Sequence, residues 1–192
     1  TPVIWDAESG RILIALKRQE GVHEGCAVFA PDGRRIAISA ENSAAKVWDA
    51  KTGTELVALK GHESPVKCIA FSSNGQSIAT GSDDHTAKVW DATSGRELTT
   101  LTGHKNGVIS VQFSPDGMRV LTVSYDGTAK IWDSETGQVL VTLTAENSTF
   151  NKQTISVAAF NRDRIHLSTK LSDEHVLMFS ASPFQMEDLP GD

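Results

Sequence analysis

The sequence predicts an all-β fold made of repeated antiparallel sheets, and three observations carry that prediction. Ten residues, 124–133, recur almost unchanged at 82–91 and in a weaker form at 40–49. Each copy alternates small or apolar residues with polar ones and follows turn-forming residues, which is typical of a strand entered through a tight turn. No stretch of the chain keeps the apolar spacing of an amphipathic helix.

The repeat is about 42 residues long, and its length indicates the type of fold. Tryptophans stand at positions 5, 48, 90 and 132, with intervals of 43, 42 and 42 residues. Residues 61–102 and 103–144 align without a gap and are identical at 19 of 42 positions. Because one small sheet cannot bury both faces by itself, such units stack on one another. Four short strands per repeat therefore predict the blades of a β-propeller.

The strands and turns follow in order along the chain. We expect strands at 66–71, 77–82, 86–91 and 97–101, and then at 108–113, 119–124, 128–133 and 139–143. Asn74-Gly75 and Asp116-Gly117 mark the first turn of each repeat, because these residues tolerate positive φ. Apolar residues on both faces of the first two strands indicate sheets that are buried on two sides.

The domain boundaries follow from the same spacing, and both ends depart from it. We expect a half blade at 1–18, with strands at 3–6 and 12–16, and a degenerate blade with strands at 154–160, 164–169 and 175–180. Phe179 takes the tryptophan position of that last unit. The full division is a half blade at 1–18, blades at 19–60, 61–102 and 103–144, a degenerate blade at 145–182 and a tail at 183–192. The chain thus holds about four to four and a half blades.

Composition argues against several classes of partner. The net charge is −6, with Lys and Arg interspersed among Asp and Glu, whereas nucleic-acid binding needs clustered basic residues. No apolar run approaches the roughly 20 residues of a membrane helix, and no signal peptide is visible. Cys26 and Cys68 are one repeat apart, which favours two small buried thiols in a reducing compartment. We therefore expect a cytoplasmic protein that binds neither nucleic acid nor membrane.

Two sets of polar residues recur with the repeat. They are His62, Ser82, Asp84 and Trp90, and then His104, Ser124, Asp126 and Trp132. A Ser, a His and an Asp are also the side chains of a hydrolase triad, so an enzyme has to be weighed. No Gly-x-Ser-x-Gly turn precedes either serine, and an enzyme has no use for one triad per blade. The pattern favours a structural role and no catalytic residue.

These motifs resemble those of the WD-repeat β-propeller family. The resemblance rests on Gly-His early in a repeat, a Ser-Pro-Asp-Gly turn, and Ser-x-Asp-x-Thr-x-Lys-x-Trp-Asp near the end; it is strong over 61–144, fair over 19–60 and weak beyond 145. It implies that each set forms a hydrogen-bonded chain, from His to Asp and from Ser to the indole. A buried indole or imidazole without a partner costs about 1–3 kcal/mol.

The blade at 19–60 lacks this set. It carries Glu20, Ala40 and Asn42 beside Trp48 at the equivalent positions. We expect this blade to be held mainly by packing, and we expect its amide hydrogens to exchange faster than those of the other two blades.

No cofactor or metal is expected. His23, His85, His166 and His175 show no ligand spacing, and no phosphate-binding loop is present. His85 stands where the next repeat has Gly127, so the spacing predicts a turn residue with positive φ there.

Partner binding is expected at positions that vary while the framework repeats. In the resembled family such positions lie on the face where partners bind, and loops on a rigid scaffold suit recognition. Tyr125 is the strongest single candidate, because it is the only tyrosine and an amphipathic ring is favoured at binding hot spots. The candidate residues are His23, Glu41, Glu63, Asp83, Lys105 and Tyr125.

Three functions remain open from the sequence. The first is a non-catalytic scaffold that binds a protein or peptide partner. The second is a sensor or repeat domain of a larger multidomain signalling protein. The third is a propeller enzyme, which ranks last because no unrepeated acid–base pair converges.

Ring closure also stays open, because a propeller with open ends exposes strand edges. The N-terminal half blade could complete the last unit and make a four-bladed ring. Alternatively, two chains could form a homodimeric ring of about eight blades, or the chain could be part of a longer propeller. The sequence favours the two larger rings.

Overall fold

The computed structural model describes residues 3–16, 26–40, 43–144, 160, 166–170 and 176–180. All regular structure in these residues is β-strand. The expected first strand of the last unit, apart from Phe160, and the tail at 183–192 lie outside the described residues. The strands are β1 (Val3–Trp5), β2 (Ile12–Ala15), β3 (Ala27–Phe29), β4 (Arg35–Ala40), β5 (Ala44–Asp49), β6 (Glu55–Lys60), β7 (Val66–Phe71), β8 (Ser77–Ser82), β9 (Thr86–Asp91), β10 (Glu97–Thr102), β11 (Val108–Phe113), β12 (Arg119–Ser124), β13 (Thr128–Asp133), β14 (Val139–Thr144), β15 (His166–Lys170) and β16 (Val176–Ser180).

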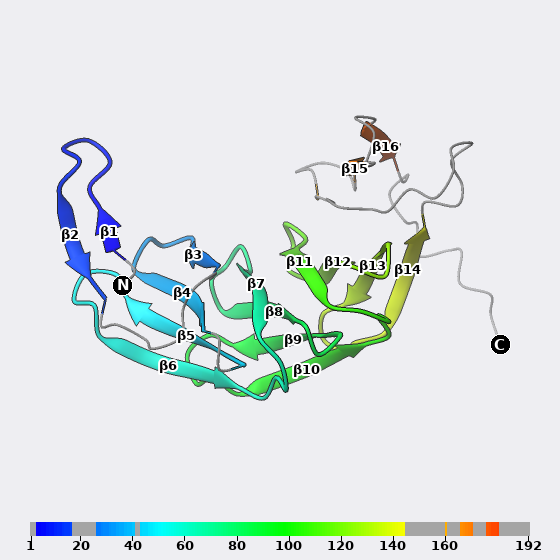
Figure 1. Cartoon of the computed structure of the whole chain (residues 1–192), viewed down its shortest axis with the longest axis horizontal. Helices are drawn as coiled ribbons and strands as arrows, with labels where there is room; N and C mark the ends of the chain where they lie inside the picture. The colour runs from blue at the N-terminus through cyan, green and yellow to red at the C-terminus, as the bar shows by residue number, and fades with distance from the viewer. Residues whose placement is uncertain are drawn as a thin grey trace.

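The strands form three four-stranded sheets, β3–β6, β7–β10 and β11–β14, and two strand pairs, β1–β2 and β15–β16. Every pairing is antiparallel between neighbours in sequence, so each sheet is a meander. In Figure 1 the three sheets lie side by side along an arc, with β1–β2 at one end and β15–β16 at the other. Their first strands lie on the inside of the arc and their fourth strands on the outside. These are β-propeller blades, as the sequence predicts.

The hydrophobic cores lie between blades. One core joins Ala37 and Val47 of the first full blade to Phe71 and Trp90 of the second. The next core repeats this arrangement between the second blade and the third, around Trp132. Each central blade therefore buries both faces, which is the reason for the apolar residues on both sides of its strands.

The turns have the backbone conformations that the sequence indicates. Gly75 and Gly117 have φ of 67° and 76° in the first turn of their blades. His85 has φ of 71°, close to the 82° of Gly127 at the equivalent position, so the predicted positive φ is confirmed. Ser43 occupies the same position in the first full blade, also with positive φ.

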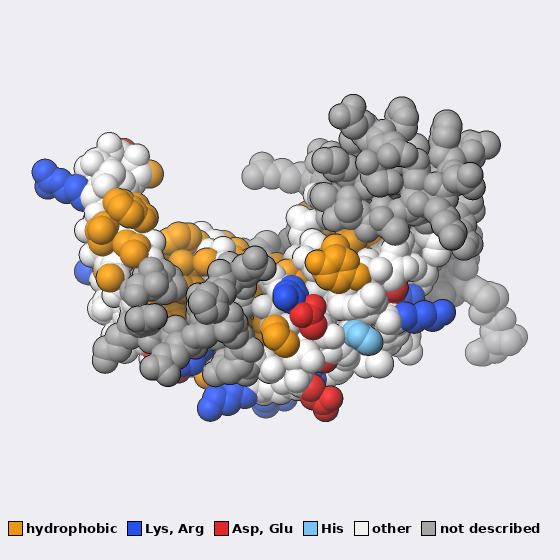
Figure 2. All heavy atoms as spheres, viewed as in Figure 1, with side chains coloured by type: hydrophobic (Ala, Val, Ile, Leu, Met, Phe, Trp, Pro, Cys, Tyr) orange, Lys and Arg blue, Asp and Glu red, His pale blue; other side chains and the backbone are white. Residues whose placement is uncertain are grey.

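The two ends of the arc hold partial sheets. At the C-terminal end, Phe179 of β16 pairs with Leu167 of β15, as Trp132 pairs with Val120 in the preceding blade. The register thus puts Phe179 where the other blades have tryptophan. At the N-terminal end, hydrophobic side chains gather over β1–β2, and Trp5, Ile12 and Leu13 are more than half exposed (Figure 2).

Candidate functional site

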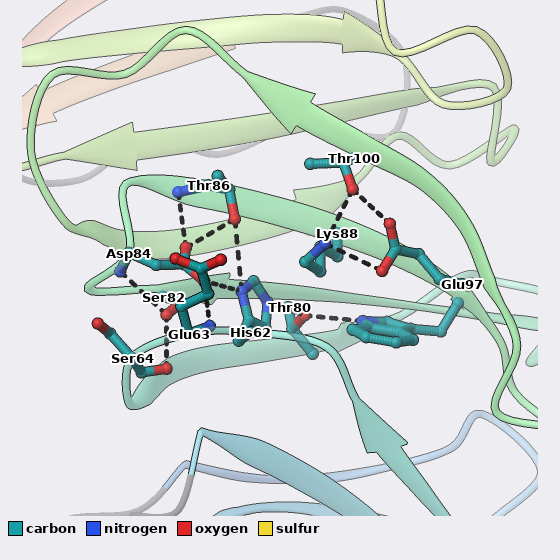
Figure 3. A network of polar contacts seen from close by, with 11 residues as sticks. His62, Glu63, Ser64, Thr80, Ser82, Asp84, Thr86, Lys88, Glu97 and Thr100 are labelled. Carbon is teal, nitrogen blue, oxygen red and sulfur yellow. Dashed lines mark hydrogen bonds and ion pairs between the residues drawn. The ribbon is translucent and has the colours of Figure 1, made fainter.

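A buried hydrogen-bonded chain crosses the blade at 61–102 (Figure 3). The indole Nε1 of Trp90 donates to Thr80 Oγ1 over 2.8 Å. Thr80 Oγ1 also lies 2.8 Å from His62 Nε2, and His62 Nδ1 lies 2.6 Å from Asp84 Oδ2. With the ring proton on Nδ1, the indole donates to the threonine, the threonine to the imidazole, and the imidazole to the carboxylate. Each donor in the chain then has one acceptor.

The strands and turns place these side chains. Ile78 of β8 pairs directly with Trp90 of β9, and Thr80 is two residues farther along β8 on the same face. His62 comes from the loop before β7, and Asp84 from the turn between β8 and β9. The chain therefore ties an entry loop, a turn and two strands together.

The carboxylate of Asp84 also holds its own turn. It accepts hydrogen bonds from the backbone N–H groups of Glu63 and Thr86 and from the Thr86 hydroxyl, over 3.0, 2.9 and 2.6 Å. The turn before β9 is thus fixed to the loop before β7. A carboxylate is well suited to this, since it can accept several donors at once.

The blade at 103–144 contains the same hydrogen-bonded chain of side chains. Trp132 Nε1 donates to Thr122 Oγ1 over 2.7 Å, His104 Nε2 lies 2.7 Å from that oxygen, and His104 Nδ1 lies 2.9 Å from Asp126 Oδ2. The imidazole and indole rings meet edge to face at centroid distances of 6.0 Å in one blade and 5.9 Å in the next. Such edge-to-face geometry is favourable for aromatic pairs.

The serine expected to bond the indole does not do so, and this prediction was wrong. Ser82 Oγ donates to the backbone oxygen of Ser64 and accepts from the backbone N–H of Asp84. Ser124 Oγ likewise donates to the backbone oxygen of Asn106. The physical reason is position, because each serine ends its strand beside the turn, whereas the indole reaches the middle of the neighbouring strand.

Thr80 and Thr122 are the residues that the sequence reasoning missed. Both are fully buried, and each accepts the indole N–H that had been assigned to a serine. A signal was present, since the threonine is identical in both repeats and shares a strand face with the serine two residues later. The blade at 19–60 has Ile38 at this position.

The replacement of threonine by Ile38 affects the hydrogen bonding of Trp48. Among the described residues, the indole nitrogen of Trp48 is the buried side-chain polar atom that has no hydrogen-bond partner. Trp48 packs instead with Ile4, Leu16 and Ile36. The first full blade therefore keeps the tryptophan and its packing without the polar chain.

The pKa values fit this arrangement. Burial raises the pKa of Asp84, but hydrogen bonds from Thr86, His62 and Glu63 outweigh burial and hold it below its ordinary value. The pKa of Asp126 is lowered in the same way. Burial lowers the pKa of His62 and His104 and outweighs their carboxylate partners. The histidines are thus neutral donors and acceptors near pH 7, as the chain requires.

The arrangement has no geometry for nucleophilic catalysis. Thr80 and Thr122 stand where a triad would hold its nucleophile, yet both are 0% exposed, and each oxygen already accepts an indole proton. A substrate carbonyl has no access to either oxygen. In the part of the chain that the structure describes, no group of three or more His, Cys, Asp or Glu could hold a metal ion.

Tyr125 and Asp83 come together from neighbouring blades. The Tyr125 side chain is 64% exposed, and its backbone N–H donates to the Gly107 oxygen over 2.9 Å. A Cβ on Gly107 would lie 2.8 Å from Asp83 Oδ1 and 3.5 Å from the Tyr125 ring, so these two side chains flank the glycine. Asp83 also forms an ion pair with Lys67 over 3.1 Å.

The other candidates divide into two groups. Glu63 and Lys105 are exposed and lie at the same end of the blades, since their backbone N–H groups donate to Asp84 and Asp126. His23 and Glu41 lie outside the described residues. We use the name loop face for the surface formed by Glu63, Asp83, Lys105 and Tyr125.

The two cysteines are both free thiols. Cys68 is buried, and burial raises the pKa of its thiol to about 12, while Cys26 is half-buried. A thiol with so high a pKa is a poor nucleophile at neutral pH. No long apolar helix of the kind that spans a membrane occurs in the described part of the chain.

The sheets, their register and the repeated polar chains define a repeat protein of the β-propeller class. Residues 53–91 and 95–133 each match the family model for the WD domain, G-beta repeat. These two segments therefore carry WD repeats. No curated protein matches it.

Among solved structures, the chain is similar to the crystal structure of the computationally designed Ika8 protein. The identity is 26% and the TM-score is 0.77. The match covers 93% of this chain and 52% of the designed chain, so this chain spans about half the length of that relative.

Proposed function

We propose that the chain is a non-catalytic scaffold whose loop face binds a protein or peptide partner. Repeats of this family generally serve as protein-interaction scaffolds. The observation that carries the proposal is the contrast between two kinds of polar residue. The repeated His, Asp and Thr side chains are occupied by bonds within their own blade, whereas the Tyr125 ring is 64% exposed beside a neighbouring blade.

The chemistry of the loop face supports a protein partner. An exposed tyrosine offers a large amphipathic ring with few rotatable bonds, which is favoured at interface hot spots. Glu63 and Lys105 add exposed charges of both signs at the same end of the blades. The overall charge of −6 also favours a protein partner over nucleic acid, whose binding needs clustered basic residues.

The test compares two exposed positions at opposite ends of β12. Tyr125→Ala removes the ring from the loop face, and Met118→Ala is the matched control, because Met118 is 69% exposed at the other end of the strand. Proteins that cross-link to the intact chain are identified, and their binding to each purified variant is measured. We expect Tyr125→Ala to weaken binding with little change in the midpoint of thermal unfolding.

Two outcomes would contradict the proposal. Equal binding by Tyr125→Ala and Met118→Ala would show that the loop face does not carry the interaction. Loss of the fold in Tyr125→Ala would show that this ring has a structural role.

We also propose that further blades cover the β1–β2 end of the arc, supplied by a second copy or by a longer chain. Its exposed Trp5, Ile12 and Leu13 support this, since large exposed apolar patches mark contact sites. Sedimentation of this chain at two concentrations separates the two sources. A dimer at the higher concentration supports the second copy, and a monomer at both concentrations excludes it.

A further inference from the structure

The chain contains two Asn-Gly pairs, Asn74-Gly75 and Asn106-Gly107, and the fold holds them differently. In an Asn-Gly pair the backbone nitrogen of the glycine can attack the side-chain carbonyl carbon of the asparagine. Glycine permits this because it has no side chain to hinder the approach. Whether the attack occurs in a folded protein depends on what holds the two groups.

The pair at Asn74 is held apart by its turn. The backbone N–H of Gly75 donates to the Ser72 backbone oxygen over 2.8 Å, so the nucleophilic nitrogen is directed away from the side chain. The Asn74 side-chain oxygen accepts from the Gln76 backbone N–H and from the Ser72 hydroxyl, over 2.9 and 2.8 Å. The Gly75 nitrogen is therefore bonded to the Ser72 backbone oxygen, whereas the side-chain carbonyl of Asn74 is bonded to the Ser72 hydroxyl and the Gln76 N–H.

The pair at Asn106 is held together. The backbone N–H of Gly107 donates to Asn106 Oδ1 over 2.8 Å, so the nitrogen is held beside the side-chain carbonyl group that it would attack. Asn106 is exposed, so water can reach its side chain. The backbone oxygens on either side are fixed, because Ser124 Oγ donates to the Asn106 oxygen and the Tyr125 N–H to the Gly107 oxygen.

We propose that Asn106 is a site of spontaneous deamidation, with water as the co-reactant. The Gly107 nitrogen forms a bond to the Asn106 side-chain carbon, the bond from that carbon to Nδ2 breaks, and the amide leaves as ammonia with the proton from Gly107. Water then opens the five-membered imide. Opening at the side-chain carbonyl gives aspartate, and opening at the main-chain carbonyl gives isoaspartate. No oxidation or reduction takes place.

Deamidation changes the loop face directly. Either product places a new carboxylate between Lys105 and Gly107. Isoaspartate also lengthens the main chain by one methylene group, which displaces the Gly107 oxygen from the Tyr125 N–H. The site therefore alters the charge beside Tyr125, and the assignment itself does not depend on a partner being bound there.

The experiment uses the intact folded chain and compares its two Asn-Gly sites with each other. The protein is incubated at neutral and at mildly alkaline pH, and peptide mapping by mass spectrometry follows the replacement of amide by acid at each site. Enzymatic methylation of isoaspartate confirms the product. We expect Asn106 to convert faster than Asn74, and faster at alkaline pH, because the attacking amide nitrogen must lose its proton.

A second arm repeats the incubation in urea, where both pairs are unfolded. There we expect the two sites to convert at similar rates. Equal or slower conversion of Asn106 in the folded chain would overturn the proposal. If the ratio of the Asn106 rate to the Asn74 rate were the same in urea, local sequence would explain the difference. The argument from the fold would then also be overturned. Asn106→Gln verifies that the signal belongs to this residue.

Discussion

The first full blade and the two full blades that follow it differ in one hydrogen-bonded polar chain, although they share strand order, register and tryptophan. In the blades at 61–102 and 103–144, the indole N–H donates to a buried threonine that also faces a histidine. In the first full blade, Ile38 replaces the threonine, and the Trp48 indole nitrogen has no hydrogen-bond partner among the described residues. The sheet β3–β6 forms nevertheless. The comparison teaches that a four-stranded blade forms by packing without this hydrogen-bonded chain. Where the chain is present, it attaches the loop before the first strand and the turn before the third strand to the blade.

The largest loss of stability is expected when the Thr80 hydroxyl is removed, because its oxygen bonds both Trp90 and His62. Thr80→Val keeps the shape of the side chain but leaves the Trp90 indole and the His62 Nε2 without their shared partner. Two unsatisfied buried groups should lower the free energy of unfolding by about 2–4 kcal/mol. Urea denaturation measures this, with amide hydrogen exchange to locate the blade that opens.

Two controls accompany that measurement. Thr102→Val makes the same change on an exposed position of β10 and should be nearly neutral. Ser82→Ala removes the hydroxyl first expected to bond the indole. If Ser82→Ala cost more than Thr80→Val, the assignment of the threonine as the shared partner would be wrong.

A smaller difference is expected between two tryptophans. Trp90→Phe removes ring volume and also deprives Thr80 of its donor. Trp48→Phe removes ring volume and an N–H that bonds to none of the residues that the structure describes. Trp90→Phe should therefore cost about 1–2 kcal/mol more than Trp48→Phe in the free energy of unfolding. Equal losses in thermal or urea unfolding would mean that the indole bond contributes nothing.

A third comparison places a hydroxyl beside the unpaired indole. Ile38→Thr creates the acceptor that the other blades have, while Ile36→Thr puts the same change on the same strand at the equivalent of Ile78. Both lose apolar contact, but only the first gains a bond to Trp48. Ile38→Thr should be less destabilising by about 1 kcal/mol. The opposite order in urea unfolding would contradict this.

The smallest effect is the dependence of stability on pH. Folding lowers the pKa of His62 and His104 below the ordinary value of 6.5. Between the folded and ordinary values the unfolded chain binds more protons, so stability should fall as pH drops below 6.5. The lowered pKa values of Asp84 and Asp126 add a further loss below 3.8.

Proton NMR of the histidine rings measures the first part of that pH dependence. Both buried rings should titrate below 6.5, the ordinary value. A ring that titrates above this value would show that its carboxylate partner outweighs burial, and the sign of the pH dependence would then reverse.

The faster amide hydrogen exchange expected of the first full blade stays a prediction.

The sequence by itself determined the repeat, the blade and most strand boundaries. The spacing of the tryptophans and the alternation within each strand are local signals, and the structure describes β8, β9, β12 and β13 with the predicted bounds. The positive φ of His85 was also readable, because a glycine stands at the same place one repeat later. Local rules of this kind depend on neighbours in the chain.

Only the tertiary structure decided which atoms meet. The choice between Thr80 and Ser82 as partner of the indole depends on how far a side chain reaches across paired strands, and both residues share one strand face. The meeting of Asp83, Gly107 and Tyr125 depends on the stacking of two blades. Repetition in the sequence fixes what each blade is, while the loop face is set by contacts between blades, which no single repeat contains.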